Sequence, residues 1–141
     1  MVDFTTSSVS MIIQLVVLAL LVIAIVLKYQ KKFRYHGITM FSAVVLHLIS
    51  ILAVMTPSIS GFFAVPELIN YADSFVILTM VHVVLGILAA GLGIWLVGVW
   101  HLKTDMQTCF KNKRIMDITF VFWLLSIILG TVLYLKIIQA I

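Results

Sequence analysis

Four long apolar runs dominate this chain and limit what it can fold into. They occupy about residues 11–27, 37–55, 75–100 and 118–135 of the 141-residue sequence. Because a bilayer core about 30 Å thick takes ~20 helical residues to cross, each run is long enough, or nearly so, to span a membrane. Hydrophobic residues make up 64% of the chain and charged residues 10%, which is more apolar surface than a water-soluble domain could bury. The sequence predicts an all-α integral membrane four-helix bundle, one transmembrane domain covering residues 1–141.

The basic residues predict the orientation of this bundle. Of the nine Lys and Arg residues, all but Lys136 flank two polar segments, residues 28–36 and 101–117. Because basic residues favour the cytoplasmic side, we expect both segments inside and both termini outside. Basic segments against an anionic inner leaflet also explain the net charge of +4 without a nucleic-acid partner. The expected location is the cell membrane, with lipids as direct neighbours.

The segment of residues 56–74 is the longest one expected outside. It combines turn-forming and aromatic residues, which are Pro57, Gly61, Phe62, Phe63, Pro66 and Tyr71. Amphipathic aromatic segments favour the headgroup zone, so this segment is predicted to lie at the surface as a lid. Asp117 is expected at the start of the fourth helix, where a carboxylate complements the helix dipole.

Polar and small residues recur at helical spacing on three of the predicted helices. The sets are His36, Met40, Ala43, His47 and Ser50; Thr79, His82, Gly86, Ala89 and Gly93; and Thr119, Trp123, Ser126, Gly130 and Tyr134. Steps of three and four residues place each set on one face of its helix. Helices in lipid associate through small residues and interhelical hydrogen bonds, so we expect these faces to meet, with the histidines inward.

His47 and His82 are the first candidates for a cofactor site. His47 precedes the outer end of its predicted helix by nine residues, and His82 follows the outer end of its own by seven. At ~1.5 Å per residue, the two lie at similar depth. One interpretation is ligation of haem b, or of copper or another transition metal. The other is that each imidazole hydrogen-bonds a hydroxyl group or a backbone carbonyl across the bundle.

His36, His101 and Met40 join His82 as candidate metal ligands. His36 and His101 are both expected near the inner surface, and the soft sulfur of Met40 suits copper. Eleven residues separate His36 from His47 and nineteen separate His82 from His101, so two level haem sites would be mismatched by ~12 Å. The other interpretation is that the two histidines are solvated or lipid-facing at the interface, and that Met40 is a packing residue.

Common catalytic motifs are missing from the sequence. It contains no HExxH, no Gly-rich phosphate loop, no GxSxG and no close pair of buried carboxylates. A proton or solute carrier would show acidic residues within its helices, or broken helices. The chain is therefore not expected to be an enzyme on its own.

Three stretches are typical of a known family. They are HGITM at residues 36–40, VHVVLGILAAGLGIW at 81–95 and KNKRIMDITFVFWLLSIILGTVLYL at 111–135. From Arg34 onward, over about three quarters of its length, the chain resembles the small membrane proteins of the CtaM/YozB type. The family's His and Met pattern, with its later Trp, Ser, Gly and Tyr, corresponds to His36, Met40, His82, Trp123, Ser126, Gly130 and Tyr134. The resemblance implies a link to the assembly or function of haem-copper oxidases.

One position departs from that family. A further histidine is usual in the basic segment before the last helix, and the aligned residue here is Asn112, a much weaker metal ligand. An inner site built on His36 would then be incomplete unless His101 substitutes, and His47 has no counterpart in the family pattern.

These observations predict an accessory subunit or assembly factor of a membrane redox complex of the respiratory oxidase type, with other subunits of that complex as partners. Two alternatives stay open. One is a haem b electron carrier, and the other is a structural subunit of another membrane complex, such as a copper membrane monooxygenase.

Overall fold

The computed structural model describes residues 4–64, 66, 73–100 and 106–139. Its helices are α1 (Phe4–Tyr29), α2 (Phe33–Ser50), the π-helical turn η1 (Ile51–Met55), α3 (Thr56–Phe63), α4 (Ser74–Trp100), α5 (Met106–Lys111) and α6 (Lys113–Gln139). Across these ranges the chain forms no strand. Four helical spans are long and apolar enough to cross a membrane. The predicted all-α four-helix membrane architecture is confirmed.

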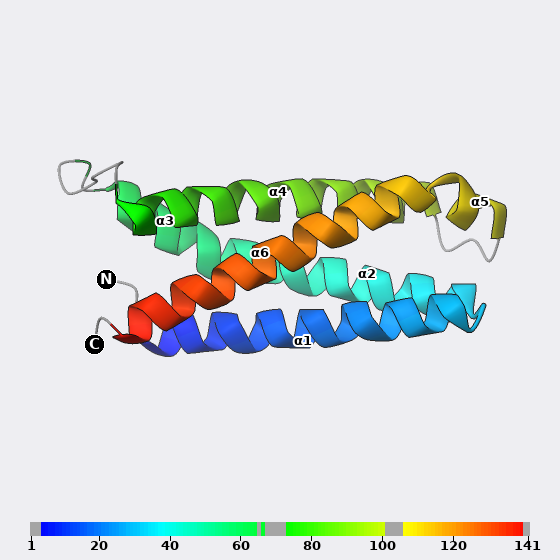
Figure 1. The fold of residues 1–141 in the computed structure, drawn as a ribbon, viewed down its shortest axis with the longest axis horizontal. Helices are drawn as coiled ribbons and strands as arrows, with labels where there is room; N and C mark the ends of the chain where they lie inside the picture. Colours follow the sequence, from blue (N-terminus) through cyan, green and yellow to red (C-terminus); the bar gives the residue numbers. More distant parts are fainter. Residues whose placement is uncertain (1–3, 65, 67–72, 101–105, 140–141) are drawn as a thin grey trace.

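The bundle consists of two antiparallel pairs (Figure 1). α1 packs chiefly against α2, and α4 packs chiefly against α6, while α6 also reaches α1 and α2 also reaches α4. The chain reverses between α1 and α2 within residues 30–32, where Lys31 adopts a left-handed conformation with φ of 58°. α6 crosses the bundle diagonally from α5 to the beginning of α1, so α1 begins and α6 ends at the same end of the molecule (Figure 1). Which side of the membrane that end faces stays a prediction.

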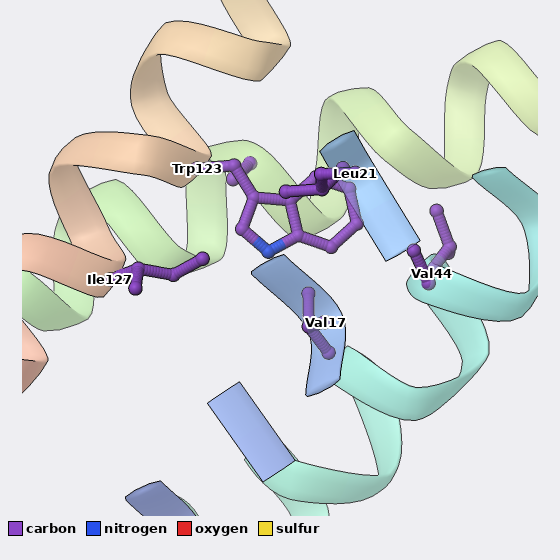
Figure 2. Packing of buried hydrophobic residues seen from close by; sticks show 7 residues of the cluster. Val17, Leu21, Val44, Trp123 and Ile127 are labelled. Carbon is purple, nitrogen blue, oxygen red and sulfur yellow. The ribbon is translucent and has the colours of Figure 1, made fainter. Parts of the chain in front are cut away.

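The centre of the bundle is apolar and is built around one tryptophan (Figure 2). Trp123 of α6 is fully buried, with 0% of its surface exposed. Its neighbours come from the other long helices and from α6 itself, and they are Val17, Leu21, Ala43, Val44, Ala89 and Ile127. Gly93 lets α4 approach this layer, because a Cβ there would lie 3.0 Å from Val44 Cγ2. The layer separates the two ends of the bundle interior.

The second span is longer than the sequence predicted. α2, η1 and α3 form one continuous span, Phe33–Phe63, of 31 residues. Residues 56–63 of the segment expected as a separate surface lid are therefore helical and continue the second span. Their position at the membrane surface stays a prediction. Residues 65 and 67–72 of that segment, with Tyr71, lie outside the described residues.

Local chemistry explains how a helix continues through Pro57. A proline lacks the N–H that the interior of an α-helix requires, but Pro57 follows directly on the π-helical turn η1, where the hydrogen-bond pattern of the helix changes. The hydroxyl of Thr56 donates to the carbonyl oxygen of Ile51 at 2.8 Å, and that of Ser58 donates to Val54 at 2.7 Å. These hydroxyls satisfy carbonyls around the wide turn, so the chain need not leave the helix.

Asp117 does not lie where the sequence placed it. α6 begins at Lys113, so Asp117 is one turn inside the helix rather than at its start. Its carboxylate lies 3.8 Å from the ammonium of Lys28 near the end of α1. The expected helix-start role is wrong, and the carboxylate instead forms a partly exposed ion pair between α1 and α6.

Candidate functional site

A cavity of about 170 Å³ lies between α1, η1, α3, α4 and α6, at the end where α1 begins and α6 finishes. We name it the terminal cavity. Its walls are mostly apolar and include Phe62 of α3 and Phe75 of α4. Its polar lining residues are Ser7, Ser10, Gln14, Ser58, Thr79, His82 and Tyr134. Such a cavity, apolar with a few converging polar groups, is the usual form of a small-molecule site.

His82 of α4 is held in one orientation by α6. Its Nδ1 donates to the carbonyl oxygen of Ser126 at 2.8 Å, since a carbonyl can only accept. The Ser126 hydroxyl in turn donates to the His82 carbonyl oxygen at 3.5 Å. In the neutral ring this leaves a lone pair on Nε2, which has no hydrogen bond within the described residues. Because Nδ1 points at α6, the Nε2 edge is left for the terminal cavity.

Gln14 of α1 meets His82 above a glycine of α6. A Cβ at Gly130 would lie 2.5 Å from Gln14 Oε1 and 3.0 Å from His82 Cε1, so only glycine leaves room for both groups. The Gln14 side chain is buried, with 7% of the residue exposed, and its Oε1 has no hydrogen-bond partner. A buried polar atom without a partner lowers the stability of the fold by about 1–3 kcal/mol. A ligand that hydrogen-bonds to Gln14 Oε1 would remove this cost.

The α1 side of the terminal cavity also carries hydroxyl groups. Ser7 Oγ is buried without a partner. The Ser8 hydroxyl lies 3.3 Å from the Tyr134 hydroxyl, and the Thr131 oxygen, whose hydroxyl donates to the Ile127 carbonyl oxygen at 2.9 Å, lies 3.9 Å from Met11 Sδ. These contacts hold α1 against α6 along one wall of the cavity.

A second cavity, of about 60 Å³, lies at the opposite end of the bundle interior. We name it the basic-end cavity, and it is lined by His36, Met40, Asn112 and Met116 together with Trp100. His36 Nδ1 donates to the Ala24 carbonyl oxygen at 2.7 Å, which ties α2 to α1. A Cβ at Gly37 would overlap the Trp100 indole, so glycine allows the ring to lie against α2.

His47 lines neither cavity. Its Nε2 donates to the Gly86 carbonyl oxygen at 3.5 Å, one turn beyond His82 on α4. Its ring packs against the Trp123 indole with the ring centroids 5.0 Å apart. His47 therefore belongs to the central layer between the two cavities.

The candidate residues from the sequence therefore lie in different parts of the bundle. His82 lines the terminal cavity, His36 and Met40 line the basic-end cavity with Asn112, and His47 lies between them. His101 lies outside the described residues. The structure does not bring His36 and His82 into one cavity.

Sequence reasoning missed the contribution of α1. Ser7, Ser10 and Gln14 line the terminal cavity but belong to the one long helix for which no inward face was predicted. The available signal was a lone glutamine in an apolar helix, three and four residues from serine and valine positions that share its face.

Haem does not fit the described residues. A cavity of about 150 Å³ holds one benzene ring, so the terminal cavity, at about 170 Å³, is far too small for a porphyrin. His47 Nε2 is also directed at a backbone carbonyl.

Copper needs a smaller site than haem and can be bound by a few side chains. Within the described ranges, no group of three or more His, Cys, Asp or Glu could hold a metal ion. Imidazole and thioether groups do occur together, because Met11 and Met55 line the terminal cavity with His82. Thioether sulfur and imidazole are the ligand types that suit copper, so these three side chains are the ones in this cavity that match it chemically.

Comparison of the chain with protein-family models, with curated proteins and with solved structures found no match. The functional argument therefore depends on the geometry of the two cavities and of the outer surface.

Proposed function

We propose that this protein is an accessory subunit or assembly factor of a larger membrane redox complex of the oxidase type, with the terminal cavity as its working site. The observation that most directly supports the terminal cavity as the working site is the pairing of His82 and Gln14 over Gly130. The oxidase type is proposed from the resemblance of residues 36–40, 81–95 and 111–135 to the CtaM/YozB type. An imidazole and an amide are brought together inside a membrane bundle, and the amide oxygen is left buried without a partner. Polar groups kept at such a cost within the membrane are typical of functional sites.

The outer surface of α4 supports a role within an assembly. Gly91 and Gly98 lie seven residues apart on one exposed face, and nothing lies within 4 Å of where their Cβ atoms would be. The neighbouring Trp95 is 46% exposed. Glycines on a lipid-facing surface allow the backbone of another membrane helix to approach closely. This face is therefore where we expect a partner subunit to pack.

A purely structural subunit, for example of a copper membrane monooxygenase, is the second candidate, because the glycine face of α4 alone would suit it. The two candidates differ in whether the terminal cavity is needed. A structural subunit tolerates substitutions that change the cavity's polar groups without unfolding the bundle, whereas an accessory factor that works through the cavity does not.

The test is deletion of the protein from its host, with complementation by variants. Deletion should lower the amount or the cofactor content of a membrane redox enzyme, and native purification should return the chain together with subunits of that enzyme. The purified chain alone should show no turnover. His82→Phe and Gln14→Leu should fail to complement, whereas Met40→Leu, in the basic-end cavity, is the matched control and should complement.

Partner packing is tested separately on α4. Gly91→Leu and Gly98→Leu should reduce co-purification of the partner subunits, whereas Val121→Leu on an exposed position of α6 should not. A chain that purifies as a monomer with its own reducible haem, and whose deletion leaves membrane redox enzymes intact, would contradict the proposal and favour an electron carrier.

A further inference from the structure

The terminal cavity has the size and the walls of a site for one ring. Its volume of about 170 Å³ is close to that of cavities which hold a single benzene ring. Aromatic side chains of α3, α4 and α6 line it, and they are Phe62, Phe75 and Tyr134. Aromatic walls favour flat ring ligands because offset-stacked and edge-to-face contacts add to the burial of apolar surface.

Two polar atoms at this cavity, one from His82 and one from Gln14, are hydrogen-bond acceptors. His82 Nε2 carries a lone pair, since Nδ1 holds the proton that is donated to Ser126. Gln14 Oε1 is a second acceptor, buried and unpartnered, on the same side of the cavity. A ligand O–H group has one proton to donate, so it satisfies one of these two acceptors.

A neutral donor fits better than a cation. Among the described residues that line the terminal cavity, there is no Asp or Glu to balance a positive charge. An unbalanced charge in an apolar cavity at membrane depth is costly to bury. The chemistry therefore favours a hydroxyl group over an ammonium group or a metal ion.

We propose that the terminal cavity binds a lipid-soluble ring that carries a hydroxyl group, such as the head group of a quinol or phenol, with its O–H donated to His82 Nε2 or Gln14 Oε1. This deepens the proposed function, on which it rests, by naming the ligand class of its working site. The ligand reaches the site from the bilayer, because the apolar walls belong to membrane-spanning helices.

The experiment measures binding to the full-length chain in lipid nanodiscs under reducing, anaerobic conditions. The ligands are a hydroquinone with a ten-carbon tail and its dimethyl ether, which has the same ring and tail but no O–H group. Hydroquinone should bind with one site per chain, and the ether should bind about five- to tenfold more weakly. The matching quinone, whose oxygens only accept, should also bind more weakly than the hydroquinone. Nitrogen-15 NMR should show the His82 Nε2 resonance shifting on addition of hydroquinone and not of the ether.

Variants locate the site. His82→Phe and Gln14→Leu should each reduce hydroquinone affinity towards that of the ether. Met40→Leu, in the basic-end cavity, should leave it unchanged. Because hydroquinone and ether are also compared on the unaltered chain, loss of folding in a variant does not remove the test.

Three results would overturn the ligand assignment. They are equal affinities for hydroquinone and ether, no binding of either, and binding of Cu(I) alone that is abolished by Met11→Leu. The assignment and the proposed function fail separately. If hydroquinone binds as expected but deletion leaves every membrane redox enzyme unchanged, only the proposed function is wrong. If deletion depletes such an enzyme but hydroquinone does not bind, only the ligand assignment is wrong.

Discussion

At the scale of single residues, the helices α1, α4 and α6 contact one another around His82. Its ring donates to α6 through Ser126, while Gln14 of α1 reaches the same point above Gly130. The sequence predicted an inward His82 and Gly130 from helical spacing, because that spacing depends only on the period of the helix. It did not predict Gln14 as their neighbour, because the periodicity of one helix says nothing of how another is rotated against it.

The close approach at Gly130 leads to a first prediction. Gly130→Ala adds a Cβ that would contact Gln14 Oε1 and His82 Cε1, so one of these groups must move. We expect a loss of about 1–3 kcal/mol in the free energy of unfolding. Gly91→Ala is the matched control, because nothing lies within 4 Å of that position, and it should change stability little. Both are measured by reversible denaturation in mixed micelles; equal stabilities of the two variants would contradict the packing described here.

His47 gives a second prediction at this scale. His47→Phe keeps a ring against Trp123 but loses the hydrogen bond to the Gly86 carbonyl, so we expect a modest loss of about 0.5–1.5 kcal/mol. His47→Ala also leaves a cavity beside Trp123 and should cost about 2–4 kcal/mol. The same denaturation measurement separates them. If the phenylalanine variant were as unstable as the alanine variant, the polar contact rather than ring packing would dominate at this position.

At the scale of helices, the sequence predicted which segments cross the membrane and placed their ends less well. Apolar runs reveal the part of a helix that lies in hydrocarbon, whereas α1 and α6 extend beyond it through polar residues such as Thr5 and Arg114. The largest error was at Pro57, since a proline followed a few residues later by glycine and aromatic residues resembles a turn. The wide turn of η1 and the hydroxyls of Thr56 and Ser58 instead carry the helix through it.

The ion pair between α1 and α6 tests how these two helices are held together. Asp117→Asn removes the partner of Lys28, but the two side chains are partly exposed and their charged atoms are 3.8 Å apart. Such surface pairs contribute about 0–1 kcal/mol and weaken with added salt. We therefore expect a change in unfolding free energy of less than about 1 kcal/mol, smaller still at high salt. A large loss that salt leaves unaltered would mean that Asp117 has a further role in the packing of α6.

At the scale of the whole molecule, the central layer divides the interior into two separate compartments. Trp123 and its apolar neighbours lie between the terminal cavity and the basic-end cavity. His82 and His36 therefore line two different cavities. The sequence could place His36 and His82 only by depth. Which cavity each one enters depends on how the helices cross, and the diagonal path of α6 (Figure 1) was not predictable from composition.

The orientation of the bundle decides which side of the membrane each compartment approaches. In the described helices, the start of α1 and the finish of α6 lie at one end of the bundle. The turn between α1 and α2, at residues 30–32, and α5 lie at the other end. The basic residues predict that the second end is cytoplasmic, so the terminal cavity would lie in the outer half of the membrane.

Cys109 can report on this orientation, because it lies in α5 and the chain contains one cysteine. In intact cells it should react with a membrane-permeant thiol reagent and remain unlabelled by an impermeant one; opening the cells should remove that difference. Labelling of Cys109 from outside would reverse the orientation and move the terminal cavity to the cytoplasmic half.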